Sequence, residues 1–496
     1  MNIYHLFLNA RHKYADNIAI IDPRNHVSLT FSAIVDKFHL VAKFLDQQSI
    51  PAGSKVALLG DTDAESLILD YALMASGRVR VPLDNALSVR ELQSQINDSG
   101  AMVLAYQQNC REVALSLSQQ GIRCIPVSLF TSGPATPYQI ADIHPQQLLS
   151  LNYTGGSTGQ PKAVMHTHAS FVSVISNMIL ARQIVPGDKF LNVRPLWPIA
   201  AVVVLAHILA GGTVILEQRF RAESYISLLQ YHEARYSSLV PTQLARLLSL
   251  LPDQPLEDLP ALGCIDIGAS AIPGEVLDQA LRVFNGRLAL LYGMTEAPWS
   301  SYLRYATLPV EIRQSGSELS GLTGYPVFGA AIKIAGPDLA GIGEIIIGGT
   351  HLMAGYWRNE ALTLQTLQDG WLKTGDLGVY TEQGYIRIVG RIKEIIRSGG
   401  KSVLPAEVEQ CILLHPGISE VHVFGQPDPE WGEKICAAIV LSDPATAMST
   451  DDLTEFCKRQ LSRFKVPKTF YILDSLPRSH YGKIKSAEVM KKIVQL

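Results

Sequence analysis

Cysteine is scarce in this chain: there are six among 496 residues, and no two of them form a C-x-x-C pair. This spacing argues against a disulfide framework or a zinc site, so we expect reduced thiols in the core. A secretory leader is also missing, because the first residues, MNIYH, lack its charged and apolar regions. Both absences predict a cytoplasmic protein.

An excess of charge of one sign is absent as well. The formal net charge is −3, so nothing predicts binding to nucleic acid or to a membrane surface. The apolar run from Ile199 to Leu216 contains His207 and is broken by Gly211 and Gly212. A buried helix followed by a buried strand explains this run better than a membrane span does.

The P-loop pattern G-x-x-x-x-G-K-[ST] is missing, and we see no internal repeat. With 496 residues, 47% of them apolar, the chain is too long for one hydrophobic core, so we expect two or more domains. Strand-like apolar runs alternate with helix-like segments, which is typical of an α/β fold with a mostly parallel sheet. We expect strands at 55–60, 78–83 and 101–105, and helices at 34–45, 65–76 and 89–96.

One stretch, Tyr153 to Lys162, carries a distinctive set of residues. Its sequence, YTGGSTGQPK, follows a strand-like segment at 149–153. Glycines let a backbone approach a polyanion and present its N–H groups, while hydroxyls and a lysine add donors and positive charge. Alone, such a run would favour a surface turn or linker over a phosphate loop.

The order of these residues resembles the phosphate loop of the adenylate-forming superfamily, which includes acyl-CoA synthetases, adenylation domains of peptide synthetases and beetle luciferases. The family pattern is Y-T-S-G-S-T-G-x-P-K-G-V-x-x-T-H, and this chain differs from it at Gly155 and Ala163. Because Gly155 stands where the family has Ser, one hydroxyl that could donate a hydrogen bond to a phosphate is missing. The resemblance implies that ATP or AMP is bound here by Thr154, Gly155, Gly156, Ser157, Thr158, Gly159 and Lys162.

A second segment, LLYGMTE at 290–296, matches the family motif Y-G-x-T-E. By this resemblance Tyr292 stacks on adenine and Thr295 contacts the α-phosphate. Glu296 would ligate Mg²⁺ together with Thr158, since this cation prefers oxygen ligands. Further nucleotide contacts are implied for Gly268, Ala269, Ser270, Gly293, Met294, Asp376 and Arg391.

In the family, the region that corresponds to residues 195–216 lines the pocket for the carboxylic acid. Members that take α-amino acids carry an Asp where this chain has Pro198, and an unpaired ammonium group is costly to bury. We therefore expect an aryl or medium-chain aliphatic acid and not an α-amino acid. For Trp197, simple core packing remains an equal alternative. The implied pocket residues are Trp197, Pro198, Val202, Gly268 and Gly293.

A domain boundary is expected near Gly390, where the composition becomes more basic. We expect an AMP-binding domain over 1–390, a hinge over 391–393 and a small domain over 394–496. In relatives the small domain rotates at the position of Lys393 between two half-reactions. Asp376 and Arg391 would bind the ribose. Contacts to the pantetheine arm of CoA are implied for Gly399, Gly400 and Lys401, and contacts to CoA for Trp431 and Phe464.

The last motif, LPRSHYGKI at 476–484, is similar to the family's L-P-R-T-x-x-G-K-[IV]. Its Lys483 would place a mobile positive charge between the attacking carboxylate and the α-phosphate, two anions that repel each other. The resemblance therefore implies a catalytic set of Lys483, Thr295 and Glu296, with Lys483 also contacting ATP.

The resemblance implies an α/β fold. A large domain would contain layered, mostly parallel sheets and a small barrel-like part, and a small mobile α+β domain would follow it. The implied reaction converts an acid and Mg·ATP into an acyl-adenylate and pyrophosphate, and the thiol of CoA then displaces AMP without a protein nucleophile. Two alternatives remain. One is an enzyme that loads the phosphopantetheine of a separate carrier protein, which would act in trans because no carrier domain follows Lys483. The other is a non-catalytic nucleotide-binding relative.

Overall fold

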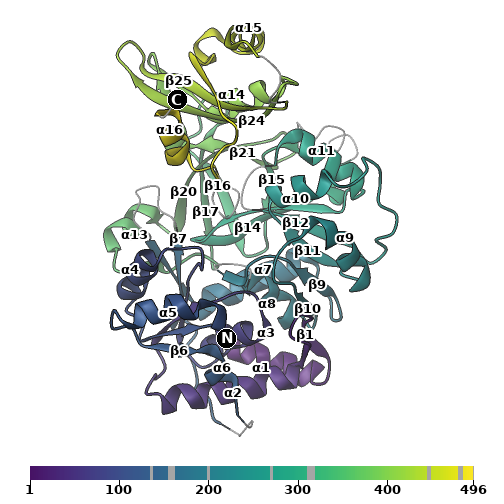
Figure 1. Cartoon of the computed structure of the whole chain (residues 1–496), viewed down its shortest axis with the longest axis vertical. Coiled ribbons are helices and arrows are strands. Elements are labelled where there is room, and N and C mark those ends of the chain that lie inside the picture. The colour runs from purple at the N-terminus through teal and green to yellow at the C-terminus, as the bar shows by residue number, and fades with distance from the viewer. Residues whose placement is uncertain are drawn as a thin grey trace. The chain divides into compact units, whose positions relative to one another are not determined.

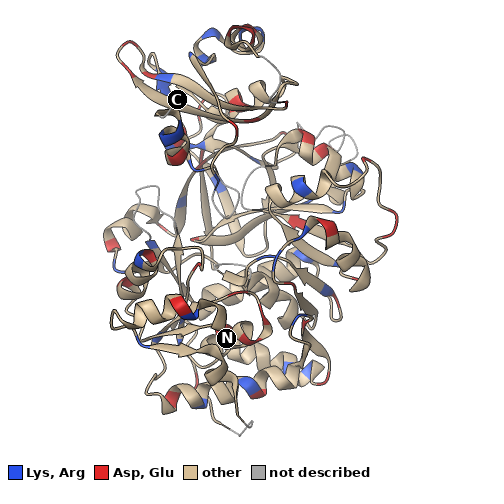
Figure 2. Cartoon of the chain, viewed as in Figure 1, with Lys and Arg blue, Asp and Glu red and all other residues tan. Residues whose placement is uncertain are grey.

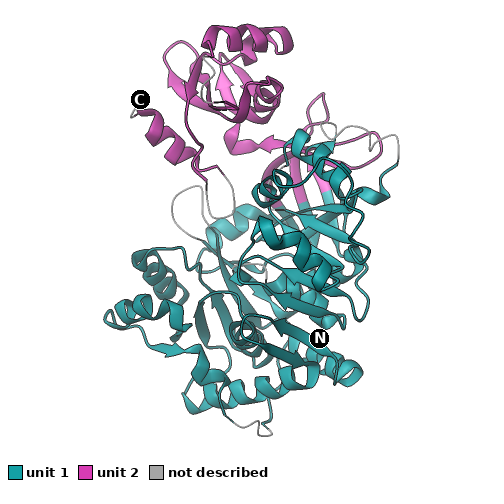
Figure 3. Ribbon diagram, turned by 45° about the vertical axis from the view of Figure 1, so that its right-hand side comes forward, with its two compact units in different colours: residues 1–268, 272–332, 347–372 teal, residues 269–271, 333–346, 373–496 magenta. Residues whose placement is uncertain are grey.

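The computed structural model describes residues 1–133, 138–154, 162–197, 201–268, 272–309, 319–443, 448–478 and 484–494. By their contacts the residues divide into two compact units, which Figure 3 shows in different colours. Unit 1 comprises Met1–Gly268, Ile272–Ile332 and Ile347–Leu372. Unit 2 comprises Ala269–Ala271, Lys333–Ile346 and Lys373–Leu496.

The first sheet of unit 1 is mostly parallel (Figure 1). Its middle strands pair in parallel, as apolar strands buried on both faces do, whereas its later strands pair antiparallel. In spatial order its strands are β15 (Leu322–Pro326), β14 (Ala297–Arg304), β13 (Leu288–Met294), β12 (Cys264–Ile267), β11 (Tyr236–Leu239), β9 (Lys189–Asn192), β10 (Thr213–Leu216), β1 (Ile18–Asp22) and β2 (Val27–Thr30).

A second sheet of unit 1 carries the strand before the glycine-rich segment and the strand after it. In spatial order the strands are β18 (Gly355–Tyr356), β8 (Lys162–Thr167), β7 (Leu148–Thr154), β4 (Val79–Pro82), β3 (Lys55–Leu59), β5 (Val103–Tyr106) and β6 (Cys124–Pro126). The strands before and after the glycine-rich segment, β7 and β8, pair antiparallel, as do β8 and β18, whereas the pairs β4–β7, β3–β4, β3–β5 and β5–β6 are parallel.

A layer of helices connects the two sheets. Helix α7 (His168–Arg182) contacts β8 of the second sheet and β14 of the first, while α8 (Ala201–Leu209) contacts β9 and β10. This layer holds the main hydrophobic core, which includes Phe38, Tyr71 and Phe190. The other helices of the unit are α1 (Ile3–Tyr14), α2 (Phe31–Gln47), α3 (Ala64–Ala75), α4 (Val89–Ser99), α5 (Arg111–Ser118), α6 (Val127–Thr131), α9 (Ala222–Tyr231), α10 (Pro241–Leu248), α11 (Gly274–Val283) and α13 (Glu360–Thr366).

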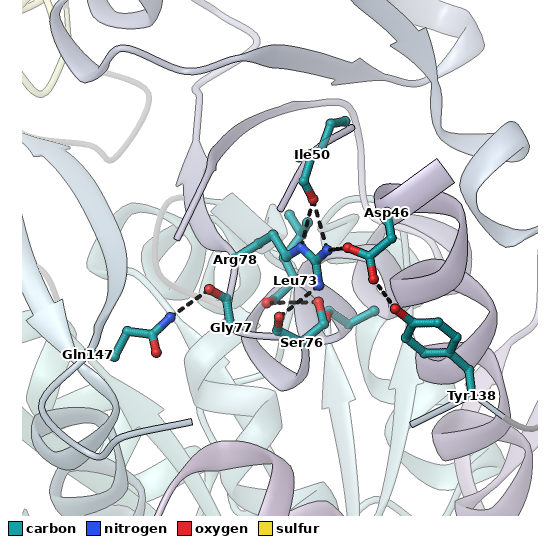
Figure 4. A network of polar contacts seen from close by, with 9 residues as sticks. Asp46, Ile50, Leu73, Ser76, Gly77, Arg78, Tyr138 and Gln147 are labelled. Carbon is teal, nitrogen blue, oxygen red and sulfur yellow. Dashed lines mark hydrogen bonds and ion pairs between the residues drawn. The ribbon is translucent and has the colours of Figure 1, made fainter. Parts of the chain in front are cut away.

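Arg78 connects the ends of two of these helices, as Figure 4 shows. Its guanidinium donates to the carbonyl of Ile50, at 2.8 Å and 3.1 Å, and to that of Ser76 at 2.9 Å. It also pairs with Asp46, which accepts a further hydrogen bond from Tyr138. Ile50 lies just beyond the end of α2 and Ser76 directly follows α3, so one side chain links the segments that follow the two helices.

Unit 2 contains an α+β fold. Helices α14 (Pro405–Leu413) and α15 (Thr450–Gln460) pack against side chains such as Ala437 of its sheet, whereas α16 (Ser486–Val494) packs in a separate cluster with Ala438. Neighbouring residues of a strand point to opposite faces, so helices cover both faces of this sheet. Its strands are β22 (Ile396–Ser398), β23 (Lys401–Val403), β24 (Ile418–Asp428), β25 (Gly432–Leu441) and β26 (Thr469–Ile472).

Three of the boundaries between the units in the sequence fall within three further strands, β16 (Ala330–Ala335), β17 (Gly343–Gly349) and β20 (Trp371–Tyr380). In spatial order these strands are followed by β21 (Ile386–Arg391), with β19 (Leu367–Gln368) beside β20. The hinge expected at 391–393 falls inside unit 2, where Arg391 ends β21 and the next two residues lie in a short 3-10 turn, Ile392–Glu394. Rotation at this turn stays a prediction.

The α/β class and the alternating helices and strands predicted from the sequence are confirmed. The run at 199–216 contains a buried helix, α8, and a buried strand, β10. Among the described residues no helix is long and apolar enough to cross a membrane. The six cysteines are all free, and charges of both signs are interspersed along the chain (Figure 2).

Candidate active site

The hairpin between β13 and β14 presents Thr295 and Glu296 in its turn. A Cβ on Gly293 would come within 2.6 Å of the backbone nitrogen of Trp299, so the close approach of the two strands requires glycine there. Trp299 itself adopts a φ of 59°, at a shift in the strand register. The hairpin is therefore locally irregular just beside the two residues that the motif predicts to be functional.

Glu296 is a buried carboxylate, 8% exposed, with a defined hydrogen-bond donor. The hydroxyl of Tyr356 donates to its Oε1 at 2.8 Å, and the ammonium nitrogen of Lys162 lies 5.4 Å from the centre of the Tyr356 ring. Burial, and then the charge of Glu296, raise the pKa of Tyr356, so the phenol keeps its proton and remains a donor. Residues from the first and second predicted motifs thus lie close together.

Thr295 is fixed through its backbone. Nε2 of His166, on β8, lies 2.7 Å from the carbonyl oxygen of Thr295, and Nδ1 lies 3.2 Å from Oγ of Ser170. Burial lowers the pKa of His166 to about 4, so the imidazole is neutral at pH 7. Because a carbonyl only accepts, Nε2 carries the proton and donates it to Thr295.

Trp197, an expected pocket residue, is a buried side chain with a specific partner. Its indole N–H donates to Oδ2 of Asp70 at 2.8 Å, and Asp70 forms a fully buried ion pair with Arg80. A second pair of this kind lies close to Gly268 in sequence, where Arg182 donates to Asp266 at 2.6 Å. Val202 is buried in the same core cluster as Trp197.

Gly268 ends strand β12 beside β13. A Cβ at this position would come within 3.0 to 3.2 Å of the side chain of Leu291, so a larger residue would press on the neighbouring strand. Tyr292 is buried, and Met294 is the last residue of β13. The strand ends carrying these residues lie at one edge of the sheet, where open α/β sheets bind ligands.

In unit 2 the structure brings together the two residues expected at the ribose. Asp376 on β20 and Arg391 on β21 are cross-strand partners, and Nε of Arg391 lies 2.8 Å from Oδ1 of Asp376. Asp376 is 5% exposed. The guanidinium fixes the orientation of the buried Asp376 carboxylate, and a fixed carboxylate is suited to accept hydrogen bonds from the two hydroxyls of a ribose.

The residues expected to contact CoA also lie together in unit 2. Gly399 and Gly400 both have positive φ and form the two-residue turn between β22 and β23. A Cβ on Gly399 would come within 3.0 Å of the Trp431 ring, and Lys401 lies 4.2 Å from the ring centre of Phe464. Trp431, in turn, lies 4.8 Å from the ammonium nitrogen of Lys468.

Several predicted site residues fall outside the described part of the chain. They are Gly155, Gly156, Ser157, Thr158, Gly159, Pro198, Ala269, Ser270 and Lys483.

Tyr356 and His166, for which the sequence predicted no role, contact the Thr295–Glu296 turn directly. The one available signal for His166 was alternation along β8, which places it on the same face as Lys162.

Two family models match most of the chain. A family model described as AMP-binding enzyme matches residues 7–357, and one described as AMP-binding enzyme C-terminal domain matches residues 407–483. The chain belongs to the AMP-binding enzyme family.

Relatives of this AMP-binding enzyme cover nearly its whole length. A 2-succinylbenzoate–CoA ligase of Bacillus licheniformis is 32% identical over 479 residues, 95% of each chain. A feruloyl-CoA synthase of an Amycolatopsis species is 30% identical over 476 residues, 94% of each. The o-succinylbenzoate CoA synthetase of Bacillus subtilis, solved with its acyl-adenylate intermediate, superimposes with a TM-score of 0.86 at 28% identity and covers 99% of this chain and 98% of its own.

These findings confirm that the chain belongs to the adenylate-forming superfamily, as the motifs indicated. The chain is an AMP-forming enzyme of the acid–thiol ligase class, with an α/β fold.

Proposed function

We propose that this AMP-binding enzyme activates an aryl or medium-chain aliphatic acid with ATP and transfers the acyl group to CoA. In the first step a carboxylate oxygen attacks the α-phosphorus of ATP, and pyrophosphate leaves. In the second step a thiolate attacks the acyl carbon, and AMP leaves. The observation that carries the proposal is the buried Glu296, held by Tyr356 beside Lys162 on the strand that follows the glycine-rich segment.

The residues present fit Mg²⁺ bound mainly by nucleotide and water. Among the described residues no group of three His, Cys, Asp or Glu side chains could form a protein cage for a metal. Mg²⁺ in nucleotide sites is held by one or two carboxylates plus phosphates, and Glu296 supplies a carboxylate of this kind. The bound ion would neutralise phosphate charge, while the proposed role of Lys483 is to hold positive charge next to the attacking oxygen.

The charges around the expected pocket argue for an acid without an α-ammonium group. Two buried carboxylates, Asp70 beside Trp197 and Asp266 close to Gly268 in sequence, are already neutralised, by Arg80 and Arg182 respectively. A ligand ammonium group would compete with these guanidinium groups for a partner, at the cost of breaking a buried pair. An uncharged acyl group carries no such cost.

For the thiol, CoA is the first candidate because the two relatives described above are named as a feruloyl-CoA synthase and a 2-succinylbenzoate–CoA ligase. The aromatic and basic side chains of unit 2, including Trp431 and Phe464, suit the adenine ring and phosphates of CoA. Transfer to a separate phosphopantetheinylated carrier protein is the second candidate.

The test is pyrophosphate release with a panel of acids that includes ferulate, substituted benzoates, medium-chain fatty acids and α-amino acids. We expect turnover with aryl or medium-chain acids and none with amino acids, with AMP as the nucleotide product. CoA and a phosphopantetheinylated carrier protein are then compared as acceptors in parallel reactions. Turnover only with amino acids, or ADP as the product, would overturn the proposal, and Glu296→Gln serves as the low-activity control.

A further inference from the structure

The turn that carries Thr295 and Glu296 is short and needs support from outside its own hairpin. Only these two residues lie between Met294 and Ala297, which are paired across the hairpin. A glutamate side chain has three rotatable bonds, so a carboxylate in such a turn gains a fixed position only from its neighbours. A fixed position matters because cation ligands bind best when they are preorganised.

Three hydrogen bonds from elsewhere in unit 1 reach this turn. Nε2 of His166 donates to the carbonyl of Thr295 at 2.7 Å, and the backbone N–H of Met353 donates to the carbonyl of Glu296 at 2.8 Å. The Tyr356 hydroxyl donates to the Glu296 carboxylate, also at 2.8 Å. Both backbone carbonyls and the functional carboxylate are therefore held.

The two side-chain donors come from paired strands. Tyr356 on β18 is the register partner of Val164 on β8, and His166 follows two residues later on that strand. Lys162, Val164 and His166 lie on one face of β8, because side chains alternate along a strand. The strand leaving the glycine-rich segment is thus physically joined to the Thr295–Glu296 turn.

We propose that Tyr356 and His166 are positioning residues that hold the Thr295–Glu296 turn in the orientation that binds Mg·ATP. The inference rests on the proposed role of Glu296 as a Mg²⁺ ligand. Tyr356 orients the carboxylate itself, whereas His166 fixes the backbone from which it projects. Neither side chain takes part in bond making, so both act through Glu296 and Thr295.

The decisive variant is Tyr356→Phe, which removes one hydroxyl and keeps the ring under Lys162. ATP binding is measured by calorimetry with excess Mg²⁺ and again with EDTA. We expect affinity for Mg·ATP to fall about tenfold or more, since hydrogen bonds to charged groups are among the stronger ones. Affinity for metal-free ATP should change little and KM for the acid should stay the same, whatever stability the loss of the hydroxyl costs.

Tyr302→Phe is the matched control, because it also removes a tyrosine hydroxyl bonded to a buried carboxylate, Asp266, at 2.6 Å. It should lower the melting temperature and leave the ratio of the two ATP affinities unchanged. His166→Gln retains an N–H donor and should keep most of the Mg·ATP affinity that His166→Leu loses.

Equal weakening of ATP binding with and without Mg²⁺ in Tyr356→Phe would overturn the inference, as would no change at all. A wild-type enzyme whose ATP affinity does not depend on Mg²⁺ would also overturn it. None of these binding results depends on the identity of the acid. The pyrophosphate assay therefore tests the proposed function separately, and either one can fail without the other.

Discussion

The indole N–H of Trp197 donates a 2.8 Å hydrogen bond to Asp70, a carboxylate that is also fully buried against Arg80. The sequence allowed either a pocket residue or a core residue at Trp197. The structure shows a core side chain whose polar atom is used inside the protein. The indole orientation is therefore set by a charged pair on α3 and β4, and a role of Trp197 in the pocket stays a prediction.

Arg80→Met should destabilise unit 1 by about 3–5 kcal/mol, because it leaves Asp70 as an unpaired buried charge. Trp197→Phe, which removes one donor and keeps the ion pair, should cost clearly less. Thermal unfolding followed by circular dichroism compares the two variants. Equal losses would contradict the central role of the ion pair.

A second stability prediction concerns Arg78, whose guanidinium contacts three acceptor residues in Figure 4. Arg78→Met should cost about 2–4 kcal/mol, because buried carbonyls and part of Asp46 lose their donors. Arg282→Met is the matched control, since its ion pair with Asp253 is about half exposed on both sides. That control should leave the melting temperature unchanged. If both variants melt alike, the Arg78 network does not stabilise the helix ends.

Local sequence patterns predicted much of this fold and part of the site. The apolar spacing of Ile34, Phe38 and Val41 indicated α2, whereas the nucleotide segment expected at 153–162 from the family resemblance stays a prediction, because residues 155–161 lie outside the described part of the chain. The supporting contacts could not be predicted in this way. His166 and Thr295 are 129 residues apart, and Tyr356 and Glu296 are 60 apart. Such partners are chosen by tertiary packing, which short-range periodicity does not encode.

Buried histidines should make this enzyme sensitive to acid. Burial lowers the pKa of His168 to about 4, whereas an unfolded histidine titrates at about 6.5. As the pH falls from 6.5 to 4, His168 becomes protonated in the unfolded chain but stays neutral in the folded chain. The free energy of unfolding therefore decreases through this range. Melting temperatures at pH 7.5, 6 and 5 should show a shallower pH dependence in His168→Asn than in the wild type. Parallel slopes would exclude His168 as a source of the effect.

Lys483 is predicted to act in the first half-reaction only. Lys483→Ala should slow adenylate formation by about 10²–10³-fold, because it removes positive charge that stabilises the transition state. Thioester formation from a supplied acyl-adenylate should remain largely intact. Pyrophosphate release and thioester formation are measured separately, and equal loss in both would contradict the assigned role.

Lys393, in the turn of Ile392–Glu394, is predicted to be the hinge between half-reactions. Lys393→Pro should restrict the φ change that a hinge must absorb, and so impair thioester formation at least about tenfold more than adenylate formation. Lys393→Ala is the control, because it removes the charge and keeps backbone freedom; it should affect both steps equally and mildly. Single-turnover kinetics from ATP and from preformed acyl-adenylate separate the steps. A proline variant that slows both to the same extent would place the hinge elsewhere, and the contact-based division at Lys373 would then be the next position to test.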